Sequence, residues 1–153
     1  MRLSSRSFQD QQAIPVRYTC DGADVSPHLA WSEAPTGTQS FVLIMDDPDA
    51  PVGTFTHWVV YDIPAHQTEL PEDFPKQADV GGIRQGVNDF RRVGYGGPCP
   101  PRGHGRHRYF FKLYALDVPT LGLPGGARRT EVEARMRGHV LAEAQYMGTY
   151  ERR

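Results

Sequence analysis

The chain has 153 residues, of which 39% are hydrophobic and 23% charged, and its formal net charge is −1. This length suits one compact core and is short for two independent domains, so residues 1–153 are predicted to form a single domain. Residues 1–90 carry 5 Lys and Arg against 13 Asp and Glu, whereas residues 91–153 carry 12 against 5. Because the basic residues do not gather in one run and the aromatic residues form no base-stacking series, nucleic acid is not an expected partner.

The N-terminal residues contain no apolar segment typical of a secretion signal, and no stretch approaches the length of a membrane span. We therefore expect a cytoplasmic protein without stable membrane insertion. Only two cysteines occur, Cys20 and Cys99, and neither lies in a CxxC pair, which argues against a zinc ribbon and a disulfide scaffold. Since cytosolic thiols are usually reduced, free cysteines are expected, and a Cys20–Cys99 disulfide is the alternative.

Three segments have the pattern of strands. SFVLIM at 40–45 is a continuous apolar run bounded by turn residues, which fits a strand buried on both faces. THWVVYDIP at 56–64 and HRYFFKLYALD at 107–117 are rich in β-branched and aromatic residues. Clusters of Gly, Pro, Asp and Asn between them indicate turns and long loops. The sequence thus predicts a mainly β domain.

One helix is predicted near the C-terminus, over RRTEVEARMRGHVLAEAQYMG at 128–148. Thr130 followed by Glu133 suggests a capping box, and Gly148 suits a helix end. His139 is expected to be a packed or capping histidine rather than a ligand. An apolar stripe at helical spacing, expected to cover a sheet, comprises Val132, Met136, Val140 and Ala144 or Met147.

Histidines and aspartates stand at the ends of the predicted strands. His107 shares a strand face with Tyr109. Strict alternation places His57 on the same face as the other odd-numbered residues of its strand, Val59, Tyr61 and Ile63. Asp47 and Asp49 follow the first strand in DDPDAP, where prolines stiffen the backbone. Strand ends and the loops that follow them are common positions for binding residues.

The loop YGGPCPPRGHGRH, at 95–107, contains four glycines and three prolines and runs directly into the third strand. Glycine lets the backbone approach a ligand closely, and proline lowers the entropy cost of holding one conformation. This composition suits the wall of a binding pocket. An ordinary turn between strands is the alternative.

Three segments follow one another along the chain: DPDAP at 47–51, the histidine of THWVVYDIP, and GGPCPPRG followed by HRYFFKLYALD. In this order they resemble the signature segments of the phosphatidylethanolamine-binding protein family, also called Raf kinase inhibitor-like proteins. The CPP form and the short C-terminus resemble its bacterial and archaeal branch. The chain also resembles further blocks of that branch at IPVRYTCDGADVSPHLAW, QGVNDF and GHVLAEAQYMGTYERR. The resemblance therefore covers nearly the whole chain. The resemblance implies two antiparallel sheets in a Greek-key β-sandwich, with a C-terminal helix packed on one side.

The resemblance also implies a small cavity that binds an anion such as phosphate, acetate or a phosphoethanolamine head group, with no cofactor and no metal. Arg91, Arg92, His104 and Arg106 depart from the family pattern and add basic groups near the expected mouth. Carried over by motif, the expected ligand-binding residues are Asp47, Asp49, His57, Cys99, Pro100, Pro101, His107 and Tyr109.

Protonated histidines and the tyrosine hydroxyl can donate hydrogen bonds to phosphate oxygens, while Asp47 can orient a histidine, keep it protonated or attract an ammonium group. A binding protein rather than an enzyme is therefore expected. The family name suggests a kinase or protease inhibitor as the alternative. A metal-dependent hydrolase using His57, His107 and His104 with the aspartates is less favoured, because the chain has neither HExxH nor GxSxG. A homodimer is a further expectation from the resemblance.

Overall fold

The computed structural model describes residues 1–153 and contains two β-sheets, one α-helix and one 3-10 helix. A three-stranded sheet has the order β1-β3-β6 and a seven-stranded sheet the order β2-β10-β9-β4-β5-β8-β7. All pairs are antiparallel except β2 with β10. The mainly β prediction is confirmed. The element bounds are β1 Arg2–Ser4, β2 Gln12–Ala13, η1 Val16–Tyr18, β3 Leu29–Ser32, β4 Ser40–Asp47, β5 Phe55–Pro64, β6 Glu69–Leu70, β7 Asp79–Val80, β8 Ile83–Gln85, β9 His107–Leu116, α1 Arg129–Met136 and β10 Val140–Tyr150.

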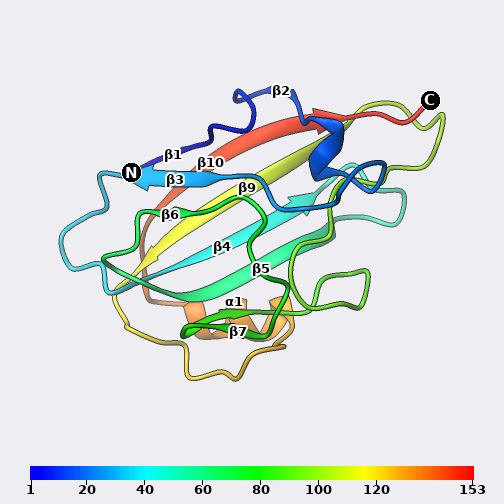
Figure 1. The fold of residues 1–153 in the computed structure, drawn as a ribbon. Helices are drawn as coiled ribbons and strands as arrows, with labels where there is room; N and C mark the ends of the chain where they lie inside the picture. The colour runs from blue at the N-terminus through cyan, green and yellow to red at the C-terminus, as the bar shows by residue number, and fades with distance from the viewer.

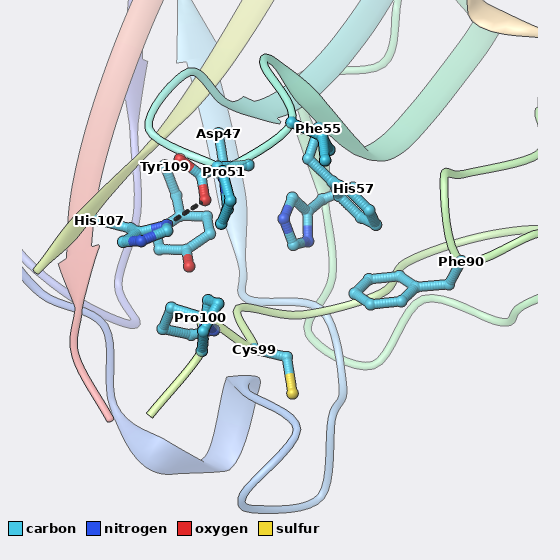
Figure 2. A pocket seen from close by; sticks show the side chains of 12 residues that line it. Asp47, Pro51, Phe55, His57, Phe90, Cys99, Pro100, His107 and Tyr109 are labelled. Atoms are coloured by element: carbon cyan, nitrogen blue, oxygen red, sulfur yellow. Dashed lines mark hydrogen bonds and ion pairs between the residues drawn. The ribbon is translucent and has the colours of Figure 1, made fainter. Parts of the chain in front are cut away.

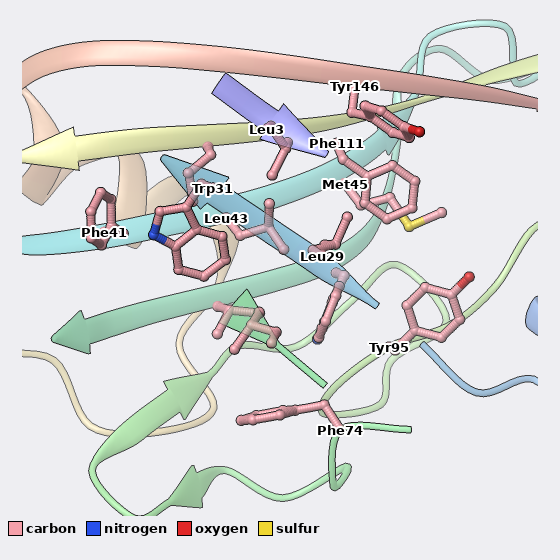
Figure 3. Packing of buried hydrophobic residues seen from close by; sticks show 14 of the residues in the cluster. Leu3, Leu29, Trp31, Phe41, Leu43, Met45, Phe74, Tyr95, Phe111 and Tyr146 are labelled. Carbon is pink, nitrogen blue, oxygen red and sulfur yellow. The ribbon is translucent and has the colours of Figure 1, made fainter. Parts of the chain in front are cut away.

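The large sheet, whose central strands β4, β5 and β9 are labelled in Figure 1, is covered on both faces by apolar side chains. Between the two sheets, Trp31 of β3 packs against Phe41 of β4 with ring centroids 5.5 Å apart (Figure 3). On the other face, Val132 and Met136 of α1 pack in a second cluster with Ile44 of β4. All eight residues of β4 are buried, which confirms the strand predicted from its continuous apolar run.

The three predicted strands are neighbours at the centre of the large sheet, in the order β9-β4-β5. Because these neighbours are antiparallel, the C-terminal end of β4 lies beside the N-terminal ends of β5 and β9. The residues predicted at those three ends are therefore brought to one end of the sheet. Neither helix has the length and apolar character needed to cross a membrane.

The predicted helix over 128–148 is correct only in its first part. The helix α1 ends at Met136, and residues 140–150 form β10, which pairs with β9 along its length. Gly138 has a φ of 80°, in the left-handed region that ends a helix. The helix therefore covers the sheet as expected, while the rest of the segment extends the sheet instead.

The start of α1 also differs from the prediction. The residue before the helix is Arg128, whose backbone N–H donates to Glu131 Oε1 at 3.1 Å. Thr130 and Glu133 therefore do not form the cap. His139 lies beyond the helix, half-exposed, with Nδ1 2.8 Å from Asp117 Oδ1. The predicted stripe beyond Met136 is wrong because Val140, Ala144 and Met147 lie in β10.

Cys20 and Cys99 form a disulfide, so the expectation of free cysteines is wrong. The segment after η1 lies against the loop at 95–101, with the Cys20 N–H donating to Pro98 O at 3.1 Å and the Gly97 N–H to Asp24 Oδ1 at 2.8 Å. These bonds hold the two cysteine Cα atoms 5.4 Å apart, within the range that a disulfide spans. The absence of CxxC spacing carried no information about this long-range pairing.

Candidate functional site

A β-bulge in β5 sets the direction of the His57 side chain. Asp46 of β4 pairs with Thr56 and Met45 pairs with Trp58, so His57 is the extra residue. A bulge puts two successive side chains on one face, and here His57 joins Trp58 on the face toward β9 Tyr109. The predicted alternation along β5 is therefore wrong, because the odd-numbered residues Val59 and Tyr61 pack in the cluster under α1.

A cavity of about 220 Å³ opens at the end of the three central strands. Figure 2 shows His57, His107 and Tyr109 around one space, with Pro100 closing it on the side opposite Asp47. The cavity combines a few polar groups with many apolar ones, as small-molecule sites usually do. Its lining residues are Asp47, Ala50, Pro51, Val52, Phe55, His57, Phe90, Cys99, Pro100, Pro101, His107 and Tyr109.

All of the expected site residues except Asp49 line this cavity. The Asp49 carboxylate accepts hydrogen bonds from the backbone N–H of Arg108 at 2.9 Å and from its guanidinium at 2.8 and 2.9 Å. These bonds with Arg108 hold the pKa of Asp49 at about 2, well below its usual range. Asp49 thus anchors the loop after β4 to β9. Arg91, Arg92, His104 and Arg106 do not line the cavity.

The loop before β9 forms one wall of the cavity, as its composition indicates. A Cβ atom on Gly97 would lie 2.2 Å from Tyr18 O, and one on Gly96 would lie 2.5 Å from the Phe90 ring. Only glycine permits this close packing. The wall residues Cys99 and Pro100 follow directly and line the cavity.

His57 is oriented by the same loop. Its Nδ1 lies 2.7 Å from Gly96 O, and because a carbonyl oxygen only accepts, Nδ1 carries the hydrogen. Burial lowers the pKa of His57, although the Gly96 hydrogen bond opposes this effect. The unliganded His57 is therefore neutral near pH 7, with the Nε2 lone pair as its remaining polar group.

His107 is the centre of a chain of three side chains. Its Nδ1 lies 2.7 Å from Asp47 Oδ2, and its Nε2 lies 2.7 Å from His104 Nδ1. Asp47 and His107 are buried, whereas His104 is exposed. Both ring nitrogens of His107 thus have protein partners, so the donor function expected of His107 toward an anion requires His104 to move away.

Tyr109 supplies the one donor at the cavity that lacks a partner. Its side chain is fully buried, and its hydroxyl has no partner in hydrogen-bond geometry, although the Asp47 carboxylate lies near it. Burial, together with the charge of Asp47, raises the pKa of the Tyr109 phenol well above its usual range. The hydroxyl therefore stays protonated and can donate to a ligand oxygen.

Sequence reasoning missed the apolar rim of the cavity. Phe55 and Phe90 pack on the His57 ring, with centroids 4.9 and 5.4 Å away, and Val52 is 91% exposed at the mouth. Phe90 lies in QGVNDF, a block that carried the family resemblance without indicating a site. No group of three or more His, Cys, Asp or Glu side chains is arranged to hold a metal ion.

Comparison with known proteins finds relatives over nearly the whole chain. The sequence profile of the phosphatidylethanolamine-binding protein family matches residues 4–151. A UPF0098 protein of Aquifex aeolicus is 65% identical over 99% of this chain and 89% of its own, and YbhB of Escherichia coli is 40% identical over 94% and 96%.

Solved structures of relatives share the fold over nearly the whole chain. A phosphatidylethanolamine-binding protein homologue of Chlamydia trachomatis has a TM-score of 0.89 at 38% identity, covering 99% of this chain and 97% of its own. Escherichia coli YbcL, described as a member of the mammalian family, has a TM-score of 0.91 at 33% identity, covering 99% and 98%. This chain therefore belongs to the phosphatidylethanolamine-binding protein family.

Proposed function

We propose that the protein binds a small anionic or zwitterionic ligand, such as a phosphorylated head group, in the cavity beside His57 and Tyr109. The observation that carries this proposal is the Tyr109 hydroxyl, which is buried and unpartnered on a side chain that lines a cavity of about 220 Å³. A buried hydroxyl without a partner is destabilising, and a ligand oxygen would supply the partner.

The other polar groups suit the two ends of such a ligand. Protonated His57 can donate from Nε2 to a second anionic oxygen, and Asp47 can accept from an ammonium group or from a protonated phosphate oxygen. The apolar rim that includes Phe55 and Phe90 can pack against the carbon atoms of the ligand. These features favour a ligand with a charged head and an apolar part over a bare ion.

Anion binding should depend on pH through His57. The neutral ring presents a lone pair that repels an anionic oxygen, so binding favours protonated His57. Burial lowers the pKa of His57 in the free protein, and a bound anion would raise it. The affinity for the anion is therefore highest below the lowered pKa of His57 in the free protein, and it is lost as the pH rises through the higher pKa of His57 in the complex.

Calorimetric titration with sulfate tests this proposal, because sulfate keeps its charge from about pH 5 to 8, where histidine titrates. The parent should bind most tightly at the acid end, and His57→Gln should bind about tenfold more weakly there with a flatter pH dependence. His28→Gln is the matched control, because His28 is equally buried but bonds Glu69 in the small sheet. Equal affinity in parent and His57→Gln, or affinity that increases with pH, would contradict the proposal. Phosphoethanolamine is then compared with sulfate.

We also propose that the site binds without chemical turnover. The cavity contains no serine, and its Cys99 is held in a disulfide, so neither the hydroxyl of a serine hydrolase nor the thiol of a cysteine hydrolase is supplied. Phosphatase and esterase assays with added zinc, magnesium and manganese should give background rates. Metal-dependent turnover that is lost in His57→Ala and in His107→Ala would favour the hydrolase alternative. A kinase or protease partner, a homodimer and a cytoplasmic location stay predictions of the sequence.

A further inference from the structure

The disulfide joins the cavity wall to a segment on the protein surface. Cys99 is half-buried and lines the cavity, whereas Cys20 is exposed. The bond spans 79 residues of sequence and links the loop at 95–101 to the segment after η1. Cys20 is therefore the cysteine that we expect a reductant to reach from solvent, while Cys99 belongs to the cavity wall.

The side chain of Arg152 makes the two sulfurs chemically different. Its Nη1 donates to Cys99 Sγ at 3.6 Å, and its Nη2 pairs with Asp21 Oδ1 at 3.1 Å. The Arg152 side chain is 19% exposed, and its Nε is buried without a hydrogen-bond partner. The Arg152 guanidinium, whose Nη1 donates to Cys99 Sγ, would stabilise a thiolate there.

We propose that the Cys20–Cys99 bond is a thiol–disulfide exchange site, opened by a dithiol reductant at Cys20, and that its opening loosens the ligand cavity. The second half of this inference rests on the proposed ligand site. Cytosolic disulfides, where they occur, are usually transient and redox-sensing, so the inference also reconciles this bond with the expected cytoplasmic location.

The exchange proceeds in two balanced steps. A reductant thiolate attacks Cys20 Sγ, a mixed disulfide forms on Cys20, and the electron pair of the broken S–S bond leaves with Cys99 as a thiolate beside Arg152. The second thiol of the reductant loses its proton and attacks the mixed disulfide. This step releases the Cys20 thiolate and the oxidised, cyclic reductant, so two electrons pass from the dithiol to the protein.

Opening the bond leaves the wall held to the segment after η1 by hydrogen bonds and packing, without a covalent tie. The bonds from the Cys20 N–H to Pro98 O and from the Gly97 N–H to Asp24 Oδ1 remain, but both partners now belong to segments without a covalent tie. Residues that position a ligand bind it more tightly when they are held in place beforehand. Reduction should therefore weaken ligand binding without unfolding the sheets.

The exchange half is tested without any ligand. Folded protein is treated with glutathione, and the adduct is located by mass spectrometry after alkylation. Dithiothreitol then gives the rate of full reduction. We expect the adduct on Cys20, and a rate that falls by about threefold or more in Arg152→Gln but recovers in Arg152→Lys, which keeps the positive charge.

Two controls separate this effect from damage to the fold. Arg102→Gln removes a neighbouring guanidinium that bonds only the backbone oxygen of Arg153, and Asp21→Asn breaks the Arg152 ion pair while leaving the cation beside the sulfur. Neither should slow reduction. An adduct on Cys99, an unchanged rate in Arg152→Gln, or equal slowing in Asp21→Asn would overturn the exchange mechanism.

The coupling half is tested by two readouts on oxidised and reduced protein. Amide hydrogen exchange at Gly97 should become faster on reduction, and sulfate affinity should fall by about threefold or more. Unchanged Gly97 exchange together with equal sulfate affinity would reject the coupling. If neither form binds sulfate, the proposed function fails and the coupling with it, whereas the exchange rates still decide the nature of the disulfide.

Discussion

Replacing Tyr109 by phenylalanine should make the protein more stable and a poorer binder at once. The substitution deletes only the hydroxyl that is buried without a partner. An unsatisfied buried hydroxyl costs about 1–3 kcal/mol, and water entering the neighbouring cavity offsets part of that cost, so we expect a gain of about 1 kcal/mol in the free energy of unfolding. For 153 residues the entropy of unfolding is about 0.3 kcal/mol/K, which converts this gain into a rise in Tm of about 3 °C.

The binding change has the opposite sign. A hydrogen bond to a charged oxygen contributes about 1.5–3 kcal/mol, so sulfate affinity should fall between about tenfold and about a hundredfold. Differential scanning calorimetry without ligand and titration calorimetry with sulfate measure the two effects. Tyr114→Phe is the matched control, because Tyr114 lies on β9 but packs on the other face of the sheet. A lower Tm with unchanged sulfate affinity in Tyr109→Phe would refute the reasoning, since the hydroxyl would then serve the fold and not a ligand.

Further predictions concern the wall, the helix and the loop after β4. Gly97→Ala should lower stability and sulfate affinity together, because its Cβ would lie 2.2 Å from a backbone oxygen; thermal unfolding and titration calorimetry measure both. Met136→Ala should destabilise by about 2–5 kcal/mol in urea unfolding while leaving sulfate affinity unchanged, because Met136 is buried under the opposite face of the sheet. The stabilisation from the Asp49–Arg108 pair should be present above the usual Asp pKa near 3.9 and be lost as the pH falls through about 2. Carbon-detected NMR titration of Asp49 should accordingly show its pKa rising toward the usual value in Arg108→Ala.

The central strands and the cavity residues were predictable because their patterns are local. The continuous apolar run of β4 and the aromatic and β-branched runs of β5 and β9 determine these strands, and Asp47 and His107 come together because the strands are antiparallel neighbours. The family resemblance, not the local patterns, implied that residues from segments far apart in sequence meet at one cavity. Periodicity alone could not show this.

The errors arose where long-range contacts override local pattern. The segment that forms β10 has apolar residues at helical spacing, but Gly138 ends the helix and pairing with β9 stabilises the strand. His57 left its predicted face because a bulge depends on the partner strand, which a single strand's alternation does not reveal. The contact of His104 with His107 and the Cys20–Cys99 bond depend on how loops are folded, and no spacing rule reports that.

The position of a bound anion tests the account most directly. Crystals of the oxidised protein grown at acid pH and soaked in sulfate would locate the anion relative to the Tyr109 hydroxyl and His57 Nε2. The account predicts one anion in the cavity within hydrogen-bond distance of both atoms, with sulfate released when the soak is repeated at alkaline pH. An empty cavity at acid pH, or an anion bound only elsewhere on the surface, would contradict the assignment of this cavity as a ligand site.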